Sequence, residues 1–360
     1  MTNYLLTGGG TAGHVNPLLA LADAITKSSE SDKVLALGTA EGLETRLVAE
    51  RGYELATIAK LPFPRRLNAY AFKFPARFAA AVAQTRLLLK QRKIDVVVGF
   101  GGYASAPAYL AAALERVPLV IHEANALPGM ANKLGAGFAK AIGVAFKSTP
   151  LRNALFVGMP LRKEIEALAS KQDKVAARTF FGLDPDSFTL LVTGGSLGAK
   201  KINEVIEESK DLLIAAGIQI LHIVGGNSEL APVKQRGYVR ISYCDRMDLA
   251  ISAADFAVSR AGASTVSEFS AVGLPALYIP YAVGNGEQAL NIKDLLAAEA
   301  AISLPDSKFS RDFVATELVA LLSSSKRVLA MAQATKTCGT ADGTARLLAL
   351  VQGVLSAQKA

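Results

Sequence analysis

Cysteine is scarce in this chain of 360 residues, where only Cys244 and Cys338 occur, far apart and without metal-type spacing. Two such thiols argue against a disulfide framework and for a reducing compartment. No uninterrupted apolar run reaches the roughly 18 residues that a membrane-spanning helix needs, and no basic leader precedes the first apolar segment. We therefore expect a cytoplasmic protein, and its length predicts two domains.

Acidic residues are missing from one stretch. None occurs between Glu54 and Asp95, whereas residues 1–160 as a whole carry 18 Lys and Arg against 10 Asp and Glu. The cations of the stretch are Lys60, Arg65, Arg66, Lys73, Arg77, Arg86, Lys90, Arg92 and Lys93. Apolar and aromatic side chains alternate with them, namely Leu61, Phe63, Leu67, Tyr70, Phe72, Phe74 and Phe78.

This basic segment, residues 60–93, has two interpretations. The aromatic residues and the helical apolar spacing of residues 75–92 favour a patch that binds an anionic membrane surface rather than nucleic acid. The alternative is a solvated basic helix whose opposite face is buried. The sequence leaves both open.

The first half has an α/β pattern. A strand at residues 4–7 is followed by Gly8-Gly-Gly-Thr-Ala-Gly-His14, a helix from Pro17 and a second strand at residues 33–38. Gly8, Gly10 and Gly13 fit G-x-G-x-x-G, the dinucleotide fingerprint, but that motif also requires an acidic residue at the end of the second strand. Gly38-Thr39 stands there instead, which argues against an NAD-dependent dehydrogenase.

Polar side chains follow further strands of the first half. A strand at residues 94–99 leads into Gly99-Phe-Gly-Gly-Tyr103 and a helix from Pro107, and a strand from Leu119 ends in His122, Glu123 and Asn125. In open α/β sheets the carboxyl ends of the strands border the ligand crevice. We expect these residues to line it: His14, Tyr103, Glu123, Asn125 and Asn132. Taken singly, Glu123 is equally a cap, Asn125 a turn residue and His122 a core histidine.

The pattern restarts in the second half. We predict a helix over residues 163–181, a strand at 189–193, the loop Gly194-Gly-Ser-Leu-Gly-Ala199, a helix at 201–214 and strands at 218–225 and 239–243. Asp184-Pro-Asp186 has D-x-D spacing but precedes its strand, so we interpret it as a turn and expect no metal in the site. Helices follow from Ser310, the last over residues 344–357.

Residues 256–291 read as strand, loop, helix and strand, with the helix stopped by Gly273 and Pro275. Backbone amides at the start of that helix, around residues 260–264, suit a diphosphate, and Glu268 one turn later suits a diol. Thr265-Val-Ser-Glu268 is also a possible capping box that binds no ligand.

Taken together, the glycine loops at 8–14, 99–103 and 194–199, His122-Glu-Ala-Asn125 and Arg260-Ala-Gly-Ala-Ser-Thr-Val-Ser-Glu268 resemble the MurG family of peptidoglycan N-acetylglucosaminyltransferases. The resemblance implies the GT-B fold, an α/β class with two Rossmann-like doubly wound parallel-sheet domains facing a cleft. It implies an acceptor and membrane domain at 1–158, a UDP-GlcNAc domain at 163–337, and a final helix, 338–360, that returns to the first domain.

The implied activity is inverting transfer of GlcNAc from UDP-GlcNAc to the MurNAc C4 hydroxyl of undecaprenyl-diphospho-MurNAc-pentapeptide (lipid I), giving lipid II, at the cytoplasmic face of the cell membrane and with no cofactor. The implied donor contacts are Thr11, Ala12, Gly13, Asn125, Arg162, Ser196, Cys244, Arg260, Ala263, Ser264, Thr265, Val266, Ser267, Glu268, Gln288 and Asn291. The acceptor contacts are Gly10, Tyr103 and Asn132. His14 and Glu123 are both candidates for the general base.

Three positions depart from the family pattern: Ala124, Met159 and Leu197 stand where glutamine, asparagine and glutamine are usual. Other enzymes of the same fold, a UDP-GlcNAc 2-epimerase or a glycosyltransferase acting on diacylglycerol, remain alternatives, as does a peripheral membrane scaffold. The epimerase has no need of the basic segment.

Overall fold

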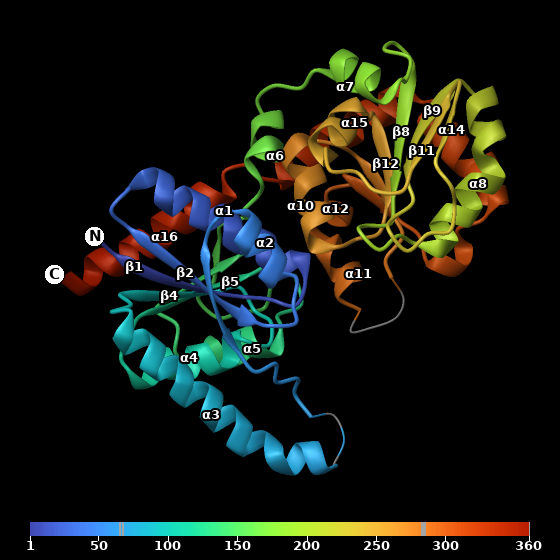
Figure 1. The fold of residues 1–360 in the computed structure, drawn as a ribbon. Coiled ribbons are helices and arrows are strands. Elements are labelled where there is room, and N and C mark those ends of the chain that lie inside the picture. Colours follow the sequence, from blue (N-terminus) through green and yellow to red (C-terminus); the bar gives the residue numbers. More distant parts are fainter. Residues whose placement is uncertain (65, 67, 282–285, 360) are drawn as a thin grey trace. The chain divides into compact units, whose positions relative to one another are not determined.

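The computed structural model describes residues 1–64, 66, 68–281 and 286–359, so Arg65 and Leu67 of the basic segment lie outside the described residues. The chain divides into two compact units. Unit 1 comprises residues 1–162 and 342–360, and unit 2 comprises residues 163–341. Each is built on one seven-stranded sheet (Figure 1).

The sheet of unit 1 is parallel throughout, in the order β3-β2-β1-β4-β5-β6-β7. Its strands are β1 (Asn3–Thr7), β2 (Lys33–Thr39), β3 (Glu54–Ile58), β4 (Val96–Gly99), β5 (Leu119–Glu123), β6 (Ala141–Val144) and β7 (Leu155–Phe156). The strand order reverses between β1 and β4, where a doubly wound sheet opens a crevice at its carboxyl edge. The loops that follow β1 and β4 therefore border the ligand position of unit 1.

Helices cover both faces of this sheet: α1 (Ala12–Ser28), α2 (Glu44–Glu50), α3 (Ala69–Gln91), α4 (Ser105–Leu114), α5 (Met130–Gly135) and α16 (Gly343–Lys359). Alternation along β1 sends Tyr4 and Leu6 into the core shared with α1 and α16, and Leu5 into the core shared with α3 and α4. Burial on both faces explains the continuous apolar strands of the sequence.

Two helices of unit 1 begin earlier than the sequence predicted. The helix expected from Pro17 begins at Ala12, because Thr11 is extended and its carbonyl accepts from the amides of His14 and Val15. The helix expected from residue 75 begins at Ala69, capped by Asn68, whose side chain accepts from the Ala71 amide at 3.0 Å. Both prolines thus lie inside helices, and His14 lies in the first turn of α1.

The sheet of unit 2 has the order β10-β11-β9-β8-β12-β13-β14. Its strands are β8 (Phe188–Thr193), β9 (Ile218–Ile223), β10 (Val233–Gln235), β11 (Tyr238–Ile241), β12 (Phe256–Ser259), β13 (Ala276–Tyr278) and β14 (Ala301–Ser303). All pairs are parallel except the short hairpin of β10 and β11, which the sequence did not predict. The order reverses between β8 and β12, so this sheet has a second switch point, and the predicted fold class is confirmed.

The helices of unit 2 are α6 (Lys163–Leu168), α7 (Lys174–Phe181), α8 (Lys200–Ala215), α9 (Met247–Ala253), α10 (Ala263–Val272), α11 (Glu287–Asn291), α12 (Lys293–Ala297), α13 (Arg311–Phe313), α14 (Val319–Leu322) and α15 (Ser325–Cys338), with short turns at Asp306–Lys308 and Val314–Leu318. The single helix predicted over 163–181 is wrong. Asp173 starts a new helix there, because its carboxylate accepts from the Ala176 amide at 2.9 Å.

Two smaller predictions for unit 2 are confirmed. Helix α10 ends at Gly273, which has φ +77° and closes the helix in the left-handed conformation. Asp184 and Asp186 form a turn before β8, in which the Asp186 amide donates to the Asp184 carboxylate at 2.9 Å.

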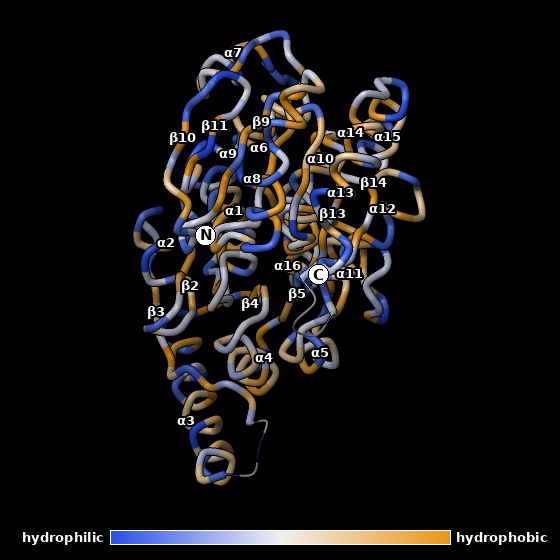
Figure 2. Tube along the Cα trace, turned by 90° about the vertical axis from the view of Figure 1, so that its right-hand side faces the viewer, coloured by the Kyte–Doolittle hydropathy of each residue, from blue (hydrophilic) through white to orange (hydrophobic). Residues whose placement is uncertain are grey.

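Helix α3 is unusual in unit 1, because its amino-terminal half projects away from the sheet in both views (Figures 1 and 2). Its fully buried residues, among them Ala81, Val82 and Leu89, lie in the second half. Across the described ranges of the chain, no helix has the length and apolarity to cross a bilayer.

The last helix completes the core of unit 1. Leu347, Val351 and Leu355 on α16 are buried in the same cluster as Val15 and Leu18 of α1. Leu347→Ala should therefore destabilise unit 1 by about 2–5 kcal/mol, measured by urea unfolding. Leu114→Ala, at an exposed leucine of the same unit, is the matched control and should change stability by about 0.5 kcal/mol or less. Equal effects at both positions would contradict the packing of α16 in this core.

Candidate functional site

Two glycine-rich loops meet at the switch point of unit 1. Gly102, after β4, has φ +93°, and a Cβ on it would lie 2.4 Å from the carbonyl oxygen of Gly9, after β1. Only glycine permits this approach, since other residues avoid that φ and would clash. The loops after β1 and β4 therefore form one backbone surface beside the first turn of α1.

The tautomer of His14 follows from its hydrogen bonds. Its Nδ1 lies 3.0 Å from the Gly9 carbonyl oxygen and 3.3 Å from the Thr11 hydroxyl. Because a carbonyl only accepts, Nδ1 of the neutral ring carries the proton and donates it to Gly9. The unprotonated lone pair is then on Nε2, next to the position of Gly101, where an added Cβ would lie 3.3 Å away. His14 is arranged to accept a proton through Nε2.

Asn132, on α5, lies on the other side of Gly101, where the same added Cβ would be 3.5 Å from its Nδ2. That Nδ2 donates to Glu123 at 2.8 Å, and the Asn132 Oδ1 accepts from Tyr109 at 2.7 Å. The structure thus brings His14, Asn132 and Glu123 together around Gly101, and that they line a ligand crevice stays a prediction.

Glu123 is held by its neighbours. Its carboxylate accepts from the amides of Asn125 at 2.9 Å and Gly129 at 3.0 Å, besides Asn132, and the residue is only 2% exposed. A carboxylate that serves three internal donors shapes the loop after β5 and orients Asn132. This geometry favours His14 over Glu123 as the group that accepts a proton.

His122, the residue before Glu123, is a core histidine, as one interpretation of the sequence had it. It is fully buried, and its Nε2 donates to the Gly158 carbonyl at 2.9 Å. Burial lowers the pKa of His122 to about 4, so the ring is neutral at physiological pH.

Glu44 is a buried carboxylate of this loop cluster that the sequence analysis did not consider. It opens α2, yet its carboxylate folds back to accept from the Gly10 amide at 2.9 Å and from the Thr39 amide and hydroxyl at 2.8 and 2.9 Å. Burial alone would raise the pKa of Glu44, but these hydrogen bonds outweigh it and hold the pKa below its ordinary value. Glu44 is therefore a buried carboxylate at the end of β2, where the sequence shows none.

Three glycines leave room for this carboxylate. A Cβ on Gly9, Gly38 or Gly42 would lie 2.3, 2.5 or 1.9 Å from atoms of Glu44. In the sequence, the glycines around Glu44, including two outside the G-x-G-x-x-G stretch, were the available signal that a side chain occupies this space. A dinucleotide diphosphate on this loop would meet the carboxylate and compete for the Gly10 amide, which further disfavours a dehydrogenase.

Anion-binding groups remain nearby. The amides of Ala12 and Gly13 open the 17-residue α1 and have no acceptor within the part of the chain that the structure describes. Tyr103 approaches this turn, with its ring 4.0 Å from a Cβ built on Gly10, and Lys60 lies over that ring at 5.8 Å. This turn suits a phosphate, as proposed for residues 11–13.

The switch point of unit 2 repeats the close approach of backbones. Gly198, in the loop after β8, has φ +87°, and a Cβ on it would lie 2.2 Å from the Val224 carbonyl oxygen. The Ser196 carbonyl accepts from the Gly226 amide at 2.9 Å, and the Ser196 side chain is exposed. The loop is thus fixed by its backbone contacts with residues 224–226, and the exposed side of Ser196 is accessible to a ligand.

Helix α10 begins on the other side of this switch point. Gly262 is its N-cap, and the amides of Ala263, Ser264 and Thr265 have no acceptor among the described residues. Thr265 is therefore the third helical residue, so the capping-box interpretation, which made it the cap, is wrong. Ser267 and Glu268 follow on the partly exposed side, whereas the Val266 side chain is buried and its amide donates to Gly262.

Two side-chain amides fix the residue before this helix start. Gln288 Oε1 accepts from the Ala261 amide at 3.2 Å and from Tyr281 at 2.9 Å, while Asn291 Nδ2 donates to the Ala261 carbonyl at 3.1 Å. Arg260 points elsewhere, because its guanidinium binds the Ile279 carbonyl at 3.1 Å and Asp306 at 2.6 Å. The open α10 amides, rather than Arg260, are the groups presented to an anion.

Two of the implied donor contacts, Arg162 and Cys244, lie apart from these loops in the chain. Arg162 is the last residue of the first segment of unit 1, and Cys244 is buried in unit 2 after β11.

Among the described residues, no group of three His, Cys, Asp or Glu side chains is placed to hold a metal.

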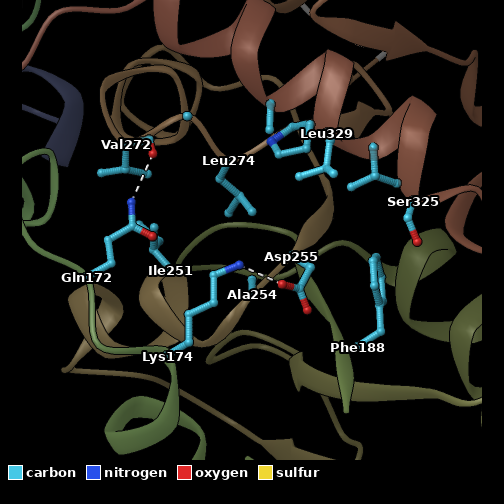
Figure 3. A pocket seen from close by; sticks show the side chains of 14 residues that line it. Gln172, Lys174, Phe188, Ile251, Ala254, Asp255, Val272, Leu274, Ser325 and Leu329 are labelled. Carbon is cyan, nitrogen blue, oxygen red and sulfur yellow. Dashed lines mark hydrogen bonds and ion pairs between the residues drawn. The ribbon is translucent and has the colours of Figure 1, made fainter. Parts of the chain in front are cut away.

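A cavity of about 240 Å³ in unit 2 lies at the opposite edge of the sheet (Figure 3). Phe188 and Asp255, at the amino ends of β8 and β12, line it, and Lys174 pairs with Asp255 at 2.5 Å. Ligands of doubly wound sheets bind at the carboxyl edge, so this cavity is separate from the candidate site.

Comparisons with known proteins cover both units. Residues 4–144 match the model of the glycosyltransferase family 28 N-terminal domain, and residues 189–347 match that of the family's C-terminal domain. Two relatives share the name UDP-N-acetylglucosamine–N-acetylmuramyl-(pentapeptide) pyrophosphoryl-undecaprenol N-acetylglucosamine transferase. The one from Clavibacter sepedonicus is 52% identical over 99% of this chain and 98% of its own, and the one from Streptomyces coelicolor is 45% identical over 99% of each.

Solved structures are similar to this chain over nearly its whole length. The crystal structure of Acinetobacter baumannii MurG matches with a TM-score of 0.80 at 26% identity, covering 98% of this chain and 100% of that one. A UDP-N-acetylglucosamine 2-epimerase matches with a TM-score of 0.66 at 13% identity, covering 97% and 94%, a likeness that extends to the fold alone.

Proposed function

Because this chain belongs to glycosyltransferase family 28, we propose that it transfers GlcNAc from UDP-GlcNAc to lipid I, the undecaprenyl-diphosphate-linked acceptor, and so forms lipid II. The observation that carries this proposal is the 52% identity to a transferase of that name over nearly the whole of both chains. The epimerase alternative is supported by the fold only.

Unit 2 would hold the donor. The three open amides of α10 and the exposed loop of Ser196 flank its switch point, where a diphosphate is favoured by the positive end of the helix. Glu268 lies one turn further along, at a place suited to the ribose hydroxyls. Gln288 and Asn291 hold the backbone of Ala261 at the helix start. Their side chains would bind the sugar of the donor if α11 moved and released Ala261.

Unit 1 would activate the acceptor. His14 Nε2 takes the proton of the MurNAc C4 hydroxyl while the oxygen of that hydroxyl forms a bond to the anomeric carbon of GlcNAc. The bond from that carbon to the diphosphate oxygen breaks, and UDP leaves with the electron pair. The α10 amides would stabilise the charge that develops on the diphosphate, because amides at a helix start are fixed in place and carry partial positive charge. The Ala12 and Gly13 amides are free for a phosphate.

The membrane contact is best placed on the first half of the basic segment. Phe63 and Phe72 are 59% and 81% exposed, and no carboxylate among the described residues pairs with Lys73 or Arg77. In the second half, Arg86 and Lys90 both pair with Glu115. Exposed aromatics beside unpaired cations fit an anionic bilayer that carries a polyprenyl substrate.

The first test follows label from UDP-GlcNAc into a lipid I analogue. The unchanged protein should produce a labelled disaccharide lipid, and His14→Ala should lower kcat by about 10²–10⁴-fold, the contribution typical of a general base. Glu123→Gln is the comparison and should cost less. Absence of any labelled disaccharide lipid would refute the transferase, and a larger loss at Glu123 would assign the base there.

Donor binding is tested at Glu268. Glu268→Ala should weaken binding of UDP and UDP-GlcNAc in calorimetry, because it removes the carboxylate that lies one turn beyond the first amides of α10. Glu317→Ala removes an exposed helical glutamate of the same unit and should leave binding unchanged. Equal affinities for the two variants would remove Glu268 from the donor site.

Membrane binding is tested by sedimentation with phosphatidylglycerol vesicles. Lys73→Gln with Arg77→Gln should weaken partitioning by about 1 kcal/mol per cation, and Phe63→Ser with Phe72→Ser should weaken it further. Arg86→Gln with Lys90→Gln makes the same change of charge at paired cations and should have little effect. If both charge pairs weaken binding alike, net charge rather than this patch is responsible.

A further inference from the structure

Glu44 and His14 are joined by a single peptide group. The carbonyl that accepts from His14 Nδ1 belongs to Gly9, and the amide that donates to Glu44 Oε2 belongs to Gly10. These are the two ends of one planar peptide unit. A hydrogen-bonded chain therefore runs from the Glu44 carboxylate, through the Gly9–Gly10 peptide, to the imidazole.

We propose that Glu44 is a positioning residue, which acts through the Gly9–Gly10 peptide to hold His14 as the Nδ1-protonated tautomer and to stabilise the imidazolium that forms when Nε2 takes a proton. The proposal rests on the proposed function, in which His14 Nε2 is the base. In hydrolytic triads a carboxylate orients a catalytic histidine by direct contact. Here a peptide group stands between the two side chains.

The physical reason is polarisation along the chain. A carboxylate that accepts from an amide polarises the N–H bond, which moves electron density away from the hydrogen and increases the negative charge on the carbonyl oxygen of the same peptide. A more negative Gly9 oxygen binds the Nδ1 proton more strongly and stabilises the imidazolium that forms during the reaction. The proton taken from the acceptor stays on Nε2, and Glu44 is not protonated.

The surroundings of Glu44 agree with this role. A buried carboxylate is costly, and it is retained here in a pocket that three glycines leave open and three donors fill. Gly10 has φ +84°, so the peptide turns in a way that glycine permits and Glu44 holds it there. The other charges of this cluster, Glu123 behind Asn132 and Lys60 over Tyr103, do not bind that peptide.

Glu44→Gln is the direct test, because the amide nitrogen replaces one oxygen and an acceptor for Gly10 or Thr39 is lost. We expect kcat to fall about tenfold, less than the general base itself contributes, with the KM for UDP-GlcNAc unchanged. The acid limb of the kcat/KM profile should move to lower pH, because the negative charge that helps to stabilise the imidazolium is removed.

Thr39→Val is the matched control. It removes the hydroxyl that donates to Oε1, in the same buried cluster, but leaves both backbone amides in place. We expect a loss of stability with the kcat and the pH profile retained. If Thr39→Val changes the pH profile as Glu44→Gln does, the effect belongs to the stability of the cluster and the proposal is overturned.

The double variant separates this inference from the proposed function. If Glu44 acts through His14, Glu44→Gln should have little further effect on kcat when His14→Ala is already present. Additive losses would overturn the role of Glu44 while leaving His14 as the base. A normal kcat for His14→Ala alone would overturn both the role of Glu44 and the role of His14 as the base. That measurement requires no change at Glu44.

A measurement on the unchanged protein covers the case in which Glu44→Gln does not fold. The chain has three histidines, so the signals of His14 are assigned as those that disappear in the His14→Ala variant. Burial lowers the pKa of His122 to about 4 and of His222 to about 3, so both of those rings are neutral at pH 7. Nitrogen-15 NMR should show Nδ1 protonated and Nε2 unprotonated in neutral His14. The opposite tautomer would overturn the proposal.

Discussion

Contact between backbones at the two switch points is the constraint on which the rest of this molecule depends. Gly102 against Gly9 in unit 1, and Gly198 against Val224 in unit 2, leave no space for a side chain. Because the strand order reverses there, each sheet opens at its carboxyl edge, and the loops that close over it consist of little more than backbone. Helix starts and amides are thereby presented directly to a ligand, with no bulky group before them.

The two loops have the same architecture but different electrostatics. In unit 2 the start of α10 keeps three amides open, and Arg260 is turned away to Asp306, so the helix end itself is the positive group. In unit 1 one loop amide is already occupied by the Glu44 carboxylate. A diphosphate suits the first arrangement, whereas the second suits a loop that orients a proton acceptor and leaves only the α1 amides for a phosphate.

The sequence predicted much of this, and its failures have identifiable causes. Apolar strands and their glycine loops were found because burial on both faces produces continuous apolar runs. The helix starts at Ala12 and Ala69 were missed because proline was taken as a start signal, while the capping groups of Thr11 and Asn68 lay further upstream. The helix at 163–181 was drawn through Asp173, whose capping bond appears only in the structure.

The site shows the same division. His14, Asn132 and Glu123 were expected together because they follow the carboxyl ends of parallel strands, β1 and β5, and the structure brings them near Gly101 although β4 lies between those strands. Glu44 was missed because its carboxylate reaches the end of β2 only when α2 turns its first residue inward, and the glycines around it were the one signal of this in the sequence. Likewise, that Glu123 is bound by three donors depends on how residues 124–132 curl around it, which no spacing in the sequence encodes.

Helix α16 has a consequence for how the chain is made. Unit 1 is discontinuous, and about half of the chain separates its first segment from the helix that supplies Leu347, Val351 and Leu355 to its core. During synthesis the first segment of unit 1 emerges before unit 2, but the part of its core that α16 completes stays open until that helix has been made. Unit 2, whose residues are contiguous, is the part that can complete its core earlier on the ribosome.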